Sequence, residues 1–202
     1  MKLYYAQGAC SLSPHIALLE AGLKFDLVRV DNKTKKTEHG DDYLAINPKG
    51  YVPALQLDDG SVLTEGPAIV QYIADLKPEA KLAPANGTLA RARLQELLGY
   101  TNSEIHKGFS PLFKPDTPAD YKPVVLENLR KRIGLFAQQL QGKTFALGEQ
   151  FTVADGYLFT VLSWSKHVGL DLSAWPVITD YLARIGARPA VQAALQAESG
   201  KK

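Results

Sequence analysis

The sequence predicts an N-terminal α/β domain followed by an all-helical domain. Strand-like runs and helical patterns alternate as far as about residue 76, and strand signals nearly vanish beyond it. The charge also changes along the chain, because residues 1–80 carry 8 basic and 11 acidic side chains while residues 81–202 carry 15 and 10. Between the two regions lies a stretch rich in proline, glycine and asparagine. We therefore expect one domain over 1–78, a linker over 79–87 and a second domain over 88–202.

The N-terminal region alternates strand and helix patterns. Its first three segments have the apolar spacing of a strand, a helix and a strand, and a charged stretch with an irregular helix follows. Farther along, Asp59-Gly60 between two apolar runs is a strong hairpin signal, and a helix with Pro67 in its first turn comes next. This order is typical of a thioredoxin-like domain. We expect strands at 2–5, 25–30, 52–57 and 61–63, and helices at 13–21 and 65–76.

The C-terminal region contains helical patterns separated by prolines and glycines, Pro111 among the breaks. One helix start has a specific signal. Thr152 and Asp155 have the spacing of a capping box, in which each side chain bonds the other residue's backbone N–H at the start of a buried helix. Their expected role is structural. We expect helices at about 88–113, 121–141, 153–167, 175–186 and 189–197.

Composition excludes several classes of protein. With 46% hydrophobic residues among 202, the chain can bury a core, so intrinsic disorder is not expected. A net charge of +2 is too small to make nucleic acid the first partner to consider. One cysteine and four scattered histidines exclude an intrachain disulfide and a structural zinc site, and we expect no metal. No segment has the apolar length of a membrane span or of a secretion signal, which predicts a soluble cytoplasmic protein.

The single cysteine, Cys10, is placed between the first predicted strand and the first predicted helix. A thiol at a helix N-terminus faces unpaired backbone N–H groups and the positive end of the helix dipole, which favour the reactive thiolate. The alternative is that Cys10 is a small buried hydrophobic residue. Cys10 and Ser13 have the spacing of the thioredoxin redox motif, with serine in place of the second cysteine. A mixed disulfide at Cys10 would therefore need an external thiol, which points to glutathione.

Two further segments are candidates for ligand binding. Val52-Pro53 stands at the start of a predicted strand, where thioredoxin-like domains place a cis-proline, although an ordinary trans bond is the commoner case. Glu65 and Gly66 open a predicted helix, where a carboxylate is stabilised by the dipole whatever its function. The same two residues could instead hold the ammonium and the carboxylate of a γ-glutamyl group.

Several motifs along the chain combine into one pattern. They are Tyr4-Tyr5 with Gly8-Ala9-Cys10-Ser11-Leu12, the segment Asn47 to Leu55, Leu63-Thr64-Glu65-Gly66, His106 to Phe113, and Phe151 to Asp155. In this order they resemble a bacterial beta-class glutathione transferase over essentially the whole chain. The cysteine at the end of the first strand, followed by His106-Lys107 in a long helix, is the more specific part of the resemblance.

The resemblance implies a role for each matching position. Cys10 would lie beside the glutathione sulfur and could form a mixed disulfide with it, Val52 would pair its backbone with the cysteinyl part, and Glu65 with Gly66 would hold the γ-glutamyl end. Lys35 would approach the glycyl carboxylate. The implied glutathione contacts also include Ala9, Tyr51, Pro53, Ser103, Glu104 and Lys107.

His106 is the second implied catalytic residue. It would approach the sulfur from the helical domain or across a dimer interface, and a hydrogen bond from it to a thiol or thiolate is chemically sensible. A lone histidine in a helix is otherwise more often structural, and we assign that interpretation to His15, His39 and His167. The family pattern has an asparagine seven residues before this histidine, whereas Gly99 stands there. Asn102, one helical turn away, is a possible substitute.

The resulting prediction is an enzyme that transfers glutathione to apolar electrophiles in detoxification, with thiol-disulfide reductase activity through Cys10. No tightly bound cofactor is expected, glutathione is the co-substrate, and a homodimer without nucleic-acid or membrane partners is implied by the resemblance. The alternative is a non-catalytic protein of the same fold that binds glutathione, apolar ligands or other proteins. The expected wall of the electrophile pocket comprises Tyr5, Phe109, Phe113 and Trp164, although the aromatic residues between 157 and 164 are more readily explained as core.

Overall fold

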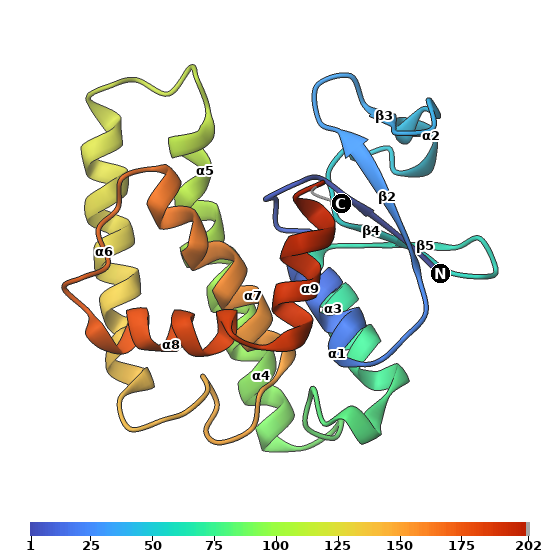
Figure 1. The fold of residues 1–202 in the computed structure, drawn as a ribbon. Helices are drawn as coiled ribbons and strands as arrows, with labels where there is room; N and C mark the ends of the chain where they lie inside the picture. Colours follow the sequence, from blue (N-terminus) through green and yellow to red (C-terminus); the bar gives the residue numbers. More distant parts are fainter. Residues whose placement is uncertain (201–202) are drawn as a thin grey trace. The chain divides into compact units, whose positions relative to one another are not determined.

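A computed structural model describes residues 1–200 of the chain. The fold consists of two compact units (Figure 1). One unit comprises Met1–Ala83 together with the described residues from Arg188 onward, and the other comprises Pro84–Ala187. None of the helices within residues 1–200 has the length and apolar character needed to cross a membrane.

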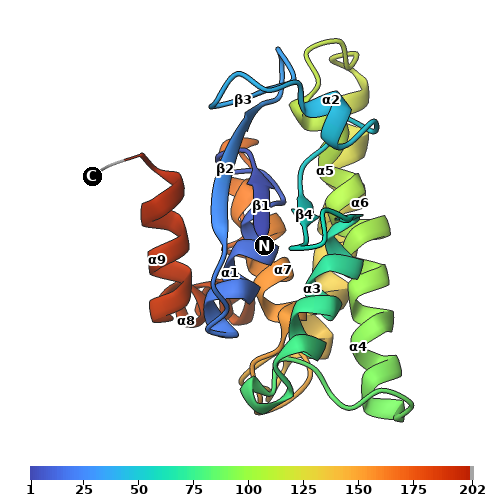
Figure 2. The same cartoon turned by 90° about the vertical axis from the view of Figure 1, so that its right-hand side faces the viewer.

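The first unit is built on a five-stranded mixed sheet (Figure 2). The strand order is β3-β2-β1-β4-β5, with β1 and β2 parallel and the other pairs antiparallel. The sequence prediction contained four of these strands and omitted β3, which is two residues long and lies in the charged stretch. The strands are β1 (Lys2–Tyr5), β2 (Asp26–Asp31), β3 (Lys36–Thr37), β4 (Ala54–Gln56) and β5 (Val62–Thr64).

Helices cover both faces of this sheet. The helices α1 (Leu12–Glu20) and α3 (Gly66–Leu76) pack against each other and against the sheet, and a short 3-10 turn, Pro78–Ala80, follows α3. Successive residues of a strand point to opposite faces, so Leu3 and Tyr4 on β1 serve different cores. Tyr4 packs against Tyr43 of the short helix α2 (Tyr43–Ile46), and the centroids of the two rings are 5.6 Å apart. The mixed sheet with this helix arrangement confirms the predicted thioredoxin-like fold.

The last helix, α9 (Pro189–Glu198), packs against α1 and belongs to the first unit (Figure 1). Its end carries a buried carboxylate, since Glu198 Oε1 lies 3.0 Å from His15 Nδ1 and Glu198 Oε2 accepts a hydrogen bond from Gly8 N–H. The sequence prediction grouped this helix with the helical domain because helical periodicity shows an apolar face but not which partner covers that face.

The second unit is entirely helical. A single helix expected over 88–113 consists of α4 (Leu89–Tyr100), a π-helical turn (Thr101–His106) and α5 (Lys107–Phe113). Pro111 was expected to break this helix, yet it lies inside α5, which continues to Phe113. The remaining elements are α6 (Tyr121–Leu140), α7 (Val153–Leu162), a 3-10 segment (Ser163–His167) and α8 (Pro176–Gly186).

All ten residues of α7 are buried, and its first turn is held by a carboxylate. Both halves of the capping box between Thr152 and Asp155 are present. Asp155 Oδ2 accepts from Thr152 N–H at 2.7 Å, while its Oδ1 accepts from Ala146 N–H and from the Tyr181 hydroxyl, each at 2.8 Å. Burial raises the pKa of Asp155, and these hydrogen bonds oppose that shift. The carboxylate thereby ties the start of α7 to α8 and to the preceding loop.

Candidate active site

Cys10 lies in the loop between β1 and α1, where the sequence predicts it. The Ser11 hydroxyl closes this loop, since it accepts from Ala6 N–H and donates to Ala6 C=O, each at 3.2 Å. The side chain of Ser11 is completely buried. The loop that carries the thiol is therefore fixed to the end of β1 by a residue next to the thiol.

The Cys10 thiol points to the segment before β4. Its Sγ donates to the Val52 carbonyl oxygen at 3.3 Å, and the Val52–Pro53 peptide bond is cis, which is the alternative typical of thioredoxin-like domains. One expectation differs from the structure. The first amides of α1 are not unpaired, because Leu12 N–H and Ser13 N–H donate to the carbonyls of Ala9 and Cys10 in tight turns.

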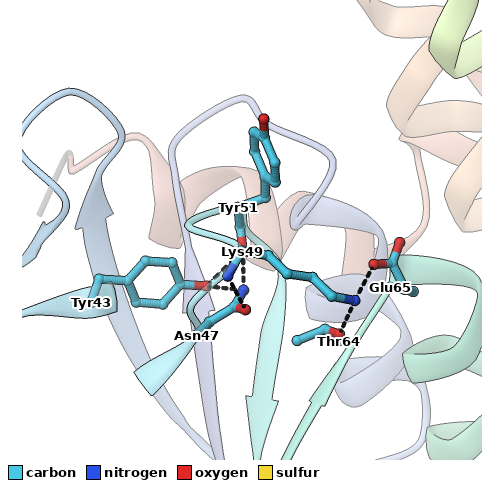
Figure 3. Close-up of polar contacts among 6 residues, drawn as sticks. All are labelled: Tyr43, Asn47, Lys49, Tyr51, Thr64 and Glu65. Atoms are coloured by element: carbon cyan, nitrogen blue, oxygen red, sulfur yellow. Dashed lines mark hydrogen bonds and ion pairs between the residues drawn. The ribbon is translucent and has the colours of Figure 1, made fainter. Parts of the chain in front are cut away.

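Two buried side chains fix the backbone just before Val52 (Figure 3). The Tyr43 hydroxyl and the Asn47 side-chain amide both donate to the Tyr51 carbonyl oxygen at 2.8 Å. Asn47 Oδ1 accepts from Lys49 N–H at 3.2 Å, which closes the turn between them. Because the Tyr51 carbonyl accepts two hydrogen bonds, the peptide group that joins Tyr51 to Val52 has little freedom to rotate. Asn47 and Tyr43 thus orient the backbone of Val52.

Glu65 is at the N-terminus of α3 and has a left-handed backbone, with φ of 69°. This conformation is uncommon for a residue with a side chain and clusters at functional sites. Its carboxylate contacts the Lys49 ammonium at 2.7 Å, and the same ammonium donates to the Thr64 hydroxyl at 3.0 Å (Figure 3). Gly66 opens α3, and an N–H at the first position of a helix has no acceptor within the helix, whereas Ala68 N–H donates to the Glu65 carbonyl at 3.0 Å. A carboxylate and a helix N-terminus therefore stand side by side.

Lys35 contacts the Asn47–Tyr51 turn. Its ammonium donates to Gly50 C=O at 2.8 Å and lies 5.7 Å from the centre of the Tyr51 ring. Tyr51 is 74% exposed. Gly50 has φ of 68°, and a Cβ there would come within 3.1 Å of Leu44, so this turn requires glycine. The Lys35 ammonium, which the resemblance implies for the glycyl carboxylate, is thus held at the turn next to Val52.

In the second unit, His106 is the last residue of the π-helical turn. Its Nδ1 lies 2.7 Å from the Tyr157 hydroxyl, and that hydroxyl donates to Asn102 Oδ1 at 2.9 Å. Burial, with a smaller contribution from Lys107, lowers the pKa of His106 from 6.5 to about 4. His106 is therefore a neutral imidazole at neutral pH. π-Helical turns are frequent at functional sites, and this one puts Asn102 and His106 on the same hydroxyl.

Aromatic rings surround His106. Trp164 stands edge-on to the imidazole with ring centroids 4.9 Å apart, and Phe109 and Phe113 lie 5.8 and 5.6 Å from the Trp164 ring. Phe109 is fully buried and Phe113 is half exposed. Three of the four residues expected to line an electrophile pocket thus form one cluster. The fourth, Tyr5, is buried on β1 of the first unit, with its ring 6.5 Å from His15.

The polar residues beside His106 have different surroundings. Glu104 Oε2 accepts from the Arg132 side chain at 2.7 Å and its Oε1 from the Ser103 hydroxyl at 3.4 Å, while Lys107 is exposed. A Cβ at Gly99 would meet no atom of another element within 4 Å, and Asn102 Oδ1 is used by Tyr157. Asn102 therefore supports His106 through Tyr157.

Three important residues were missed from the sequence. Tyr43 and Asn47 donate hydrogen bonds to the Tyr51 carbonyl. Apart from the Asn-Pro turn at 47–48, no local sequence pattern indicates this role. Tyr157 was considered for the apolar wall but was more readily explained as core because it lies in an apolar run, and it is 2% exposed. Only its hydroxyl distinguishes it from the surrounding core residues, since a buried tyrosine normally needs a hydrogen-bond partner.

No cluster of histidine, cysteine or acidic residues among residues 1–200 has the arrangement of a metal site. A thiol after β1, a cis-proline before β4 and a separate helical unit define a thioredoxin-like protein with an appended helical domain. The sequence profile described as "Glutathione S-transferase, N-terminal domain" matches residues 8–76, and that described as "Glutathione S-transferase, C-terminal domain" matches residues 100–189. The chain belongs to the glutathione S-transferase family.

Individual relatives agree over the whole length. The Escherichia coli O157:H7 protein named glutathione S-transferase GstA is 49% identical over 201 residues and covers all of both chains. A sphingomonad glutathione S-transferase solved with glutathione has a TM-score of 0.96, 47% identity and full coverage of both chains. A beta-class glutathione S-transferase from Sphingomonas chungbukensis has a TM-score of 0.95 and 51% identity, with 98% of both chains covered. The protein is a glutathione transferase, and glutathione is its co-substrate.

Proposed function

We propose that the protein conjugates glutathione to apolar electrophiles and, through Cys10, also reduces mixed disulfides of glutathione. The observation that carries the proposal is the contact between the Cys10 thiol and the Val52 carbonyl, 3.3 Å apart. It puts a nucleophilic sulfur beside a backbone edge with which a peptide ligand can pair. Glutathione is a short peptide that carries its own thiol, and it fits both features.

The groups around this contact match the two ends of glutathione. At one end, the Glu65 carboxylate binds the γ-glutamyl ammonium and the Gly66 N–H binds the adjacent carboxylate. At the other end, the Lys35 ammonium binds the glycyl carboxylate, with Tyr51 beside it. Ala9 and Pro53 contact the cysteinyl part between the two ends. This ligand orientation puts the glutathione sulfur at Cys10.

The reductase activity needs only one protein thiol. The Cys10 thiolate attacks the glutathionyl sulfur of a mixed disulfide, so a bond forms between Cys10 and glutathione and the other thiolate leaves. A second glutathione thiolate then attacks this intermediate. Glutathione disulfide is released, and the Cys10 thiolate is restored. The disulfide substrate is the oxidant and glutathione is the reductant.

Conjugation needs a second set of residues. We assign His106 to the glutathione sulfur, with Ser103, Glu104 and Lys107 as further contacts of glutathione. The aromatic cluster beside His106, which consists of Phe109, Phe113 and Trp164, supplies an apolar wall for the electrophile. Proximity of a bound thiol and a bound electrophile supplies much of the rate enhancement.

Substitution of the thiol separates the two activities. In Cys10→Ala, we expect reduction of a mixed disulfide of glutathione to be abolished and conjugation to be only reduced, because conjugation uses the sulfur of glutathione itself. Both rates are measured on the same preparation. Ser13→Ala, at the position of the missing second cysteine, is the control and should retain reduction. Unchanged reduction in Cys10→Ala would rule out the thiol mechanism.

The proposal also covers organisation and setting. It assigns glutathione binding to residues 1–78 and the electrophile wall and dimer contacts to residues 88–202, and it envisages a homodimer that acts in detoxification in the cytoplasm. The 73% exposed side chain of Leu89, at the start of α4, supports a self-association surface in this region. Sedimentation equilibrium tests the dimer, and a mass of one chain at micromolar concentration would contradict it.

A further inference from the structure

Three polar side chains of the second unit form a chain that ends at the His106 ring. His106 Nδ1 and the Tyr157 hydroxyl oxygen are 2.7 Å apart, and the Tyr157 hydroxyl and Asn102 Oδ1 are 2.9 Å apart. His106 and Asn102 belong to the same π-helical turn, whereas Tyr157 comes from the buried helix α7. Tyr157 is 2% exposed, so its hydroxyl is shielded from water and needs hydrogen-bond partners within the protein.

The number of protons that Asn102, Tyr157 and His106 can donate fixes the direction of each hydrogen bond between them. A tyrosine hydroxyl has one proton, and a side-chain amide oxygen can only accept. Since Asn102 presents its Oδ1, the hydroxyl proton of Tyr157 points to Asn102. The Tyr157 oxygen is then an acceptor for the other neighbour. His106 Nδ1 must therefore carry a proton and donate it to Tyr157.

We propose that Asn102 and Tyr157 are positioning residues that hold neutral His106 as the Nδ1–H tautomer, so that its Nε2 is a proton acceptor for the glutathione thiol. This inference rests on the proposed role of His106 at the glutathione sulfur. It also reverses the polarity expected from the sequence, in which His106 donates a hydrogen bond to the sulfur. A donor at Nε2 would require either the other tautomer or an imidazolium.

The surroundings of the ring support a neutral acceptor. Trp164 and Tyr157 both stand edge-on to the imidazole, and Lys107 is the charged neighbour that opposes a second positive charge. The lowered pKa of His106, about 4, agrees with this geometry. A neutral imidazole with Nδ1–H directed at Tyr157 has one remaining lone pair, on Nε2.

The chemical step is a general-base reaction. A lone pair of the glutathione sulfur forms the S–C bond to the electrophile, and the leaving group departs with the electron pair of its bond to carbon. As the S–C bond forms, the S–H bond breaks, its electrons return to sulfur, and the proton moves to His106 Nε2. The imidazolium then releases the proton to water, which its low pKa favours.

The tautomer can be observed directly in the full chain. Long-range proton–nitrogen NMR spectra of the histidine rings distinguish Nδ1–H from Nε2–H, and the spectrum of His106→Asn identifies the His106 signals among those of four histidines. We expect the Nδ1–H form in the unaltered protein at neutral pH. In Asn102→Leu the acceptor for the Tyr157 proton is lost, so the Tyr157 proton turns to Nδ1 and the Nε2–H form should dominate.

Two variants complete the test. Asn102→Asp keeps an acceptor oxygen and should restore the Nδ1–H form, which a general loss of packing would not. Tyr100→Phe removes another partly buried hydroxyl of the same unit, one that donates to Arg132 C=O at 2.8 Å, and should leave the His106 signals unchanged. An Nε2–H ring in the unaltered protein, or an unchanged ring in Asn102→Leu, would overturn the proposal.

Kinetics separate this inference from the proposed function. Conjugation of a chlorinated dinitrobenzene by Asn102→Leu should show a kcat at least about tenfold lower and a KM for glutathione changed less than about threefold. A wild-type rate in His106→Asn would refute the proposed role of His106 while the spectra still decide the tautomer. A slow His106→Asn enzyme with an Nε2–H ring in the unaltered protein would leave the function intact and refute the inference.

Discussion

The two candidate sites of this protein are built by different means. Around Cys10, backbone groups such as the Val52 carbonyl and the Gly66 N–H are proposed to recognise the middle and one end of the ligand, and the charged side chains of Glu65 and Lys35 form the rim. Around His106, the working groups are side-chain atoms linked by hydrogen bonds. A backbone site depends on the residues that hold the main chain in place. A side-chain site depends on protonation and on the burial of its members.

This difference decides how each site responds to change. Substitution of the residues that hold the main chain around Cys10 should have large effects, and substitution of the exposed charged residues there should have small ones. The His106 site should be sensitive to pH and to single hydroxyl groups. The following substitutions test that contrast, from the largest expected effect to the smallest.

Removal of the buried carboxylate of Glu198 should have the largest effect, because it supports the loop before Cys10 from the other end of the chain. Glu198→Ala removes the buried carboxylate that contacts His15 Nδ1 at 3.0 Å and accepts from Gly8 N–H, which costs about 2–5 kcal/mol in free energy of unfolding. Urea unfolding measures the loss. Glu198→Gln keeps one acceptor oxygen and should lose clearly less. Equal stability of the alanine variant and the unaltered protein would show that the loop does not depend on α9.

Acidification should weaken the second unit through His106. Its folded pKa of about 4 lies below the ordinary value of 6.5, so the unfolded chain binds more protons between these pH values. This contribution is complete above pH 6.5 and is lost as pH falls toward 4, and it amounts to at most about 3 kcal/mol. The unfolding free energy should fall less steeply across this window in His106→Asn. Parallel pH profiles of the two proteins would contradict the assignment.

Asn47 tests whether the backbone site depends on the Tyr51 carbonyl. Asn47→Ala removes the amide that donates to that carbonyl at 2.8 Å and should raise the KM for glutathione about five- to tenfold with a smaller change in kcat. Steady-state conjugation rates at varied glutathione measure this effect. Asn32→Ala, an exposed asparagine of the same unit, is the matched control. A KM equal to that of the control would show that Tyr43 alone holds the segment.

The exposed rim should respond least. Lys49 forms an ion pair with the Glu65 carboxylate, which is proposed to bind the γ-glutamyl ammonium. Both side chains are more than half exposed, and ion pairs between exposed side chains are weak. Lys49→Met removes a competing cation, so we expect the KM for glutathione to fall by up to about threefold. Lys77→Met, which removes the partner of Glu79, is the control. A higher KM in Lys49→Met would show that Lys49 assists binding.

Much of the fold followed from local sequence patterns. Apolar spacing located β1 and α1 to within a residue or two, and the Asp-Gly turn located the β4–β5 hairpin. The capping box at Thr152 was also predicted, and the cis bond before Pro53 was one of two alternatives that the sequence left open. In contrast, the two-residue strand β3 and the π-helical turn before Lys107 have no distinctive local pattern. Their geometry is set by the neighbouring elements.

The sequence by itself determined the order of the elements, the position of the thiol and the resemblance to glutathione transferases, because these depend on short-range periodicity, turn chemistry and motif spacing. The tertiary structure decided which distant side chains hold the Cys10 loop and the His106 ring in place. Glu198 reaches Gly8 across 190 residues, and Tyr157 reaches His106 across 51. Such contacts depend on how helices pack, and packing places a hydroxyl or a carboxylate only after the chain has folded. The tautomer proposed for His106 is therefore a property of the packed unit that His106 and its sequence neighbours could not reveal.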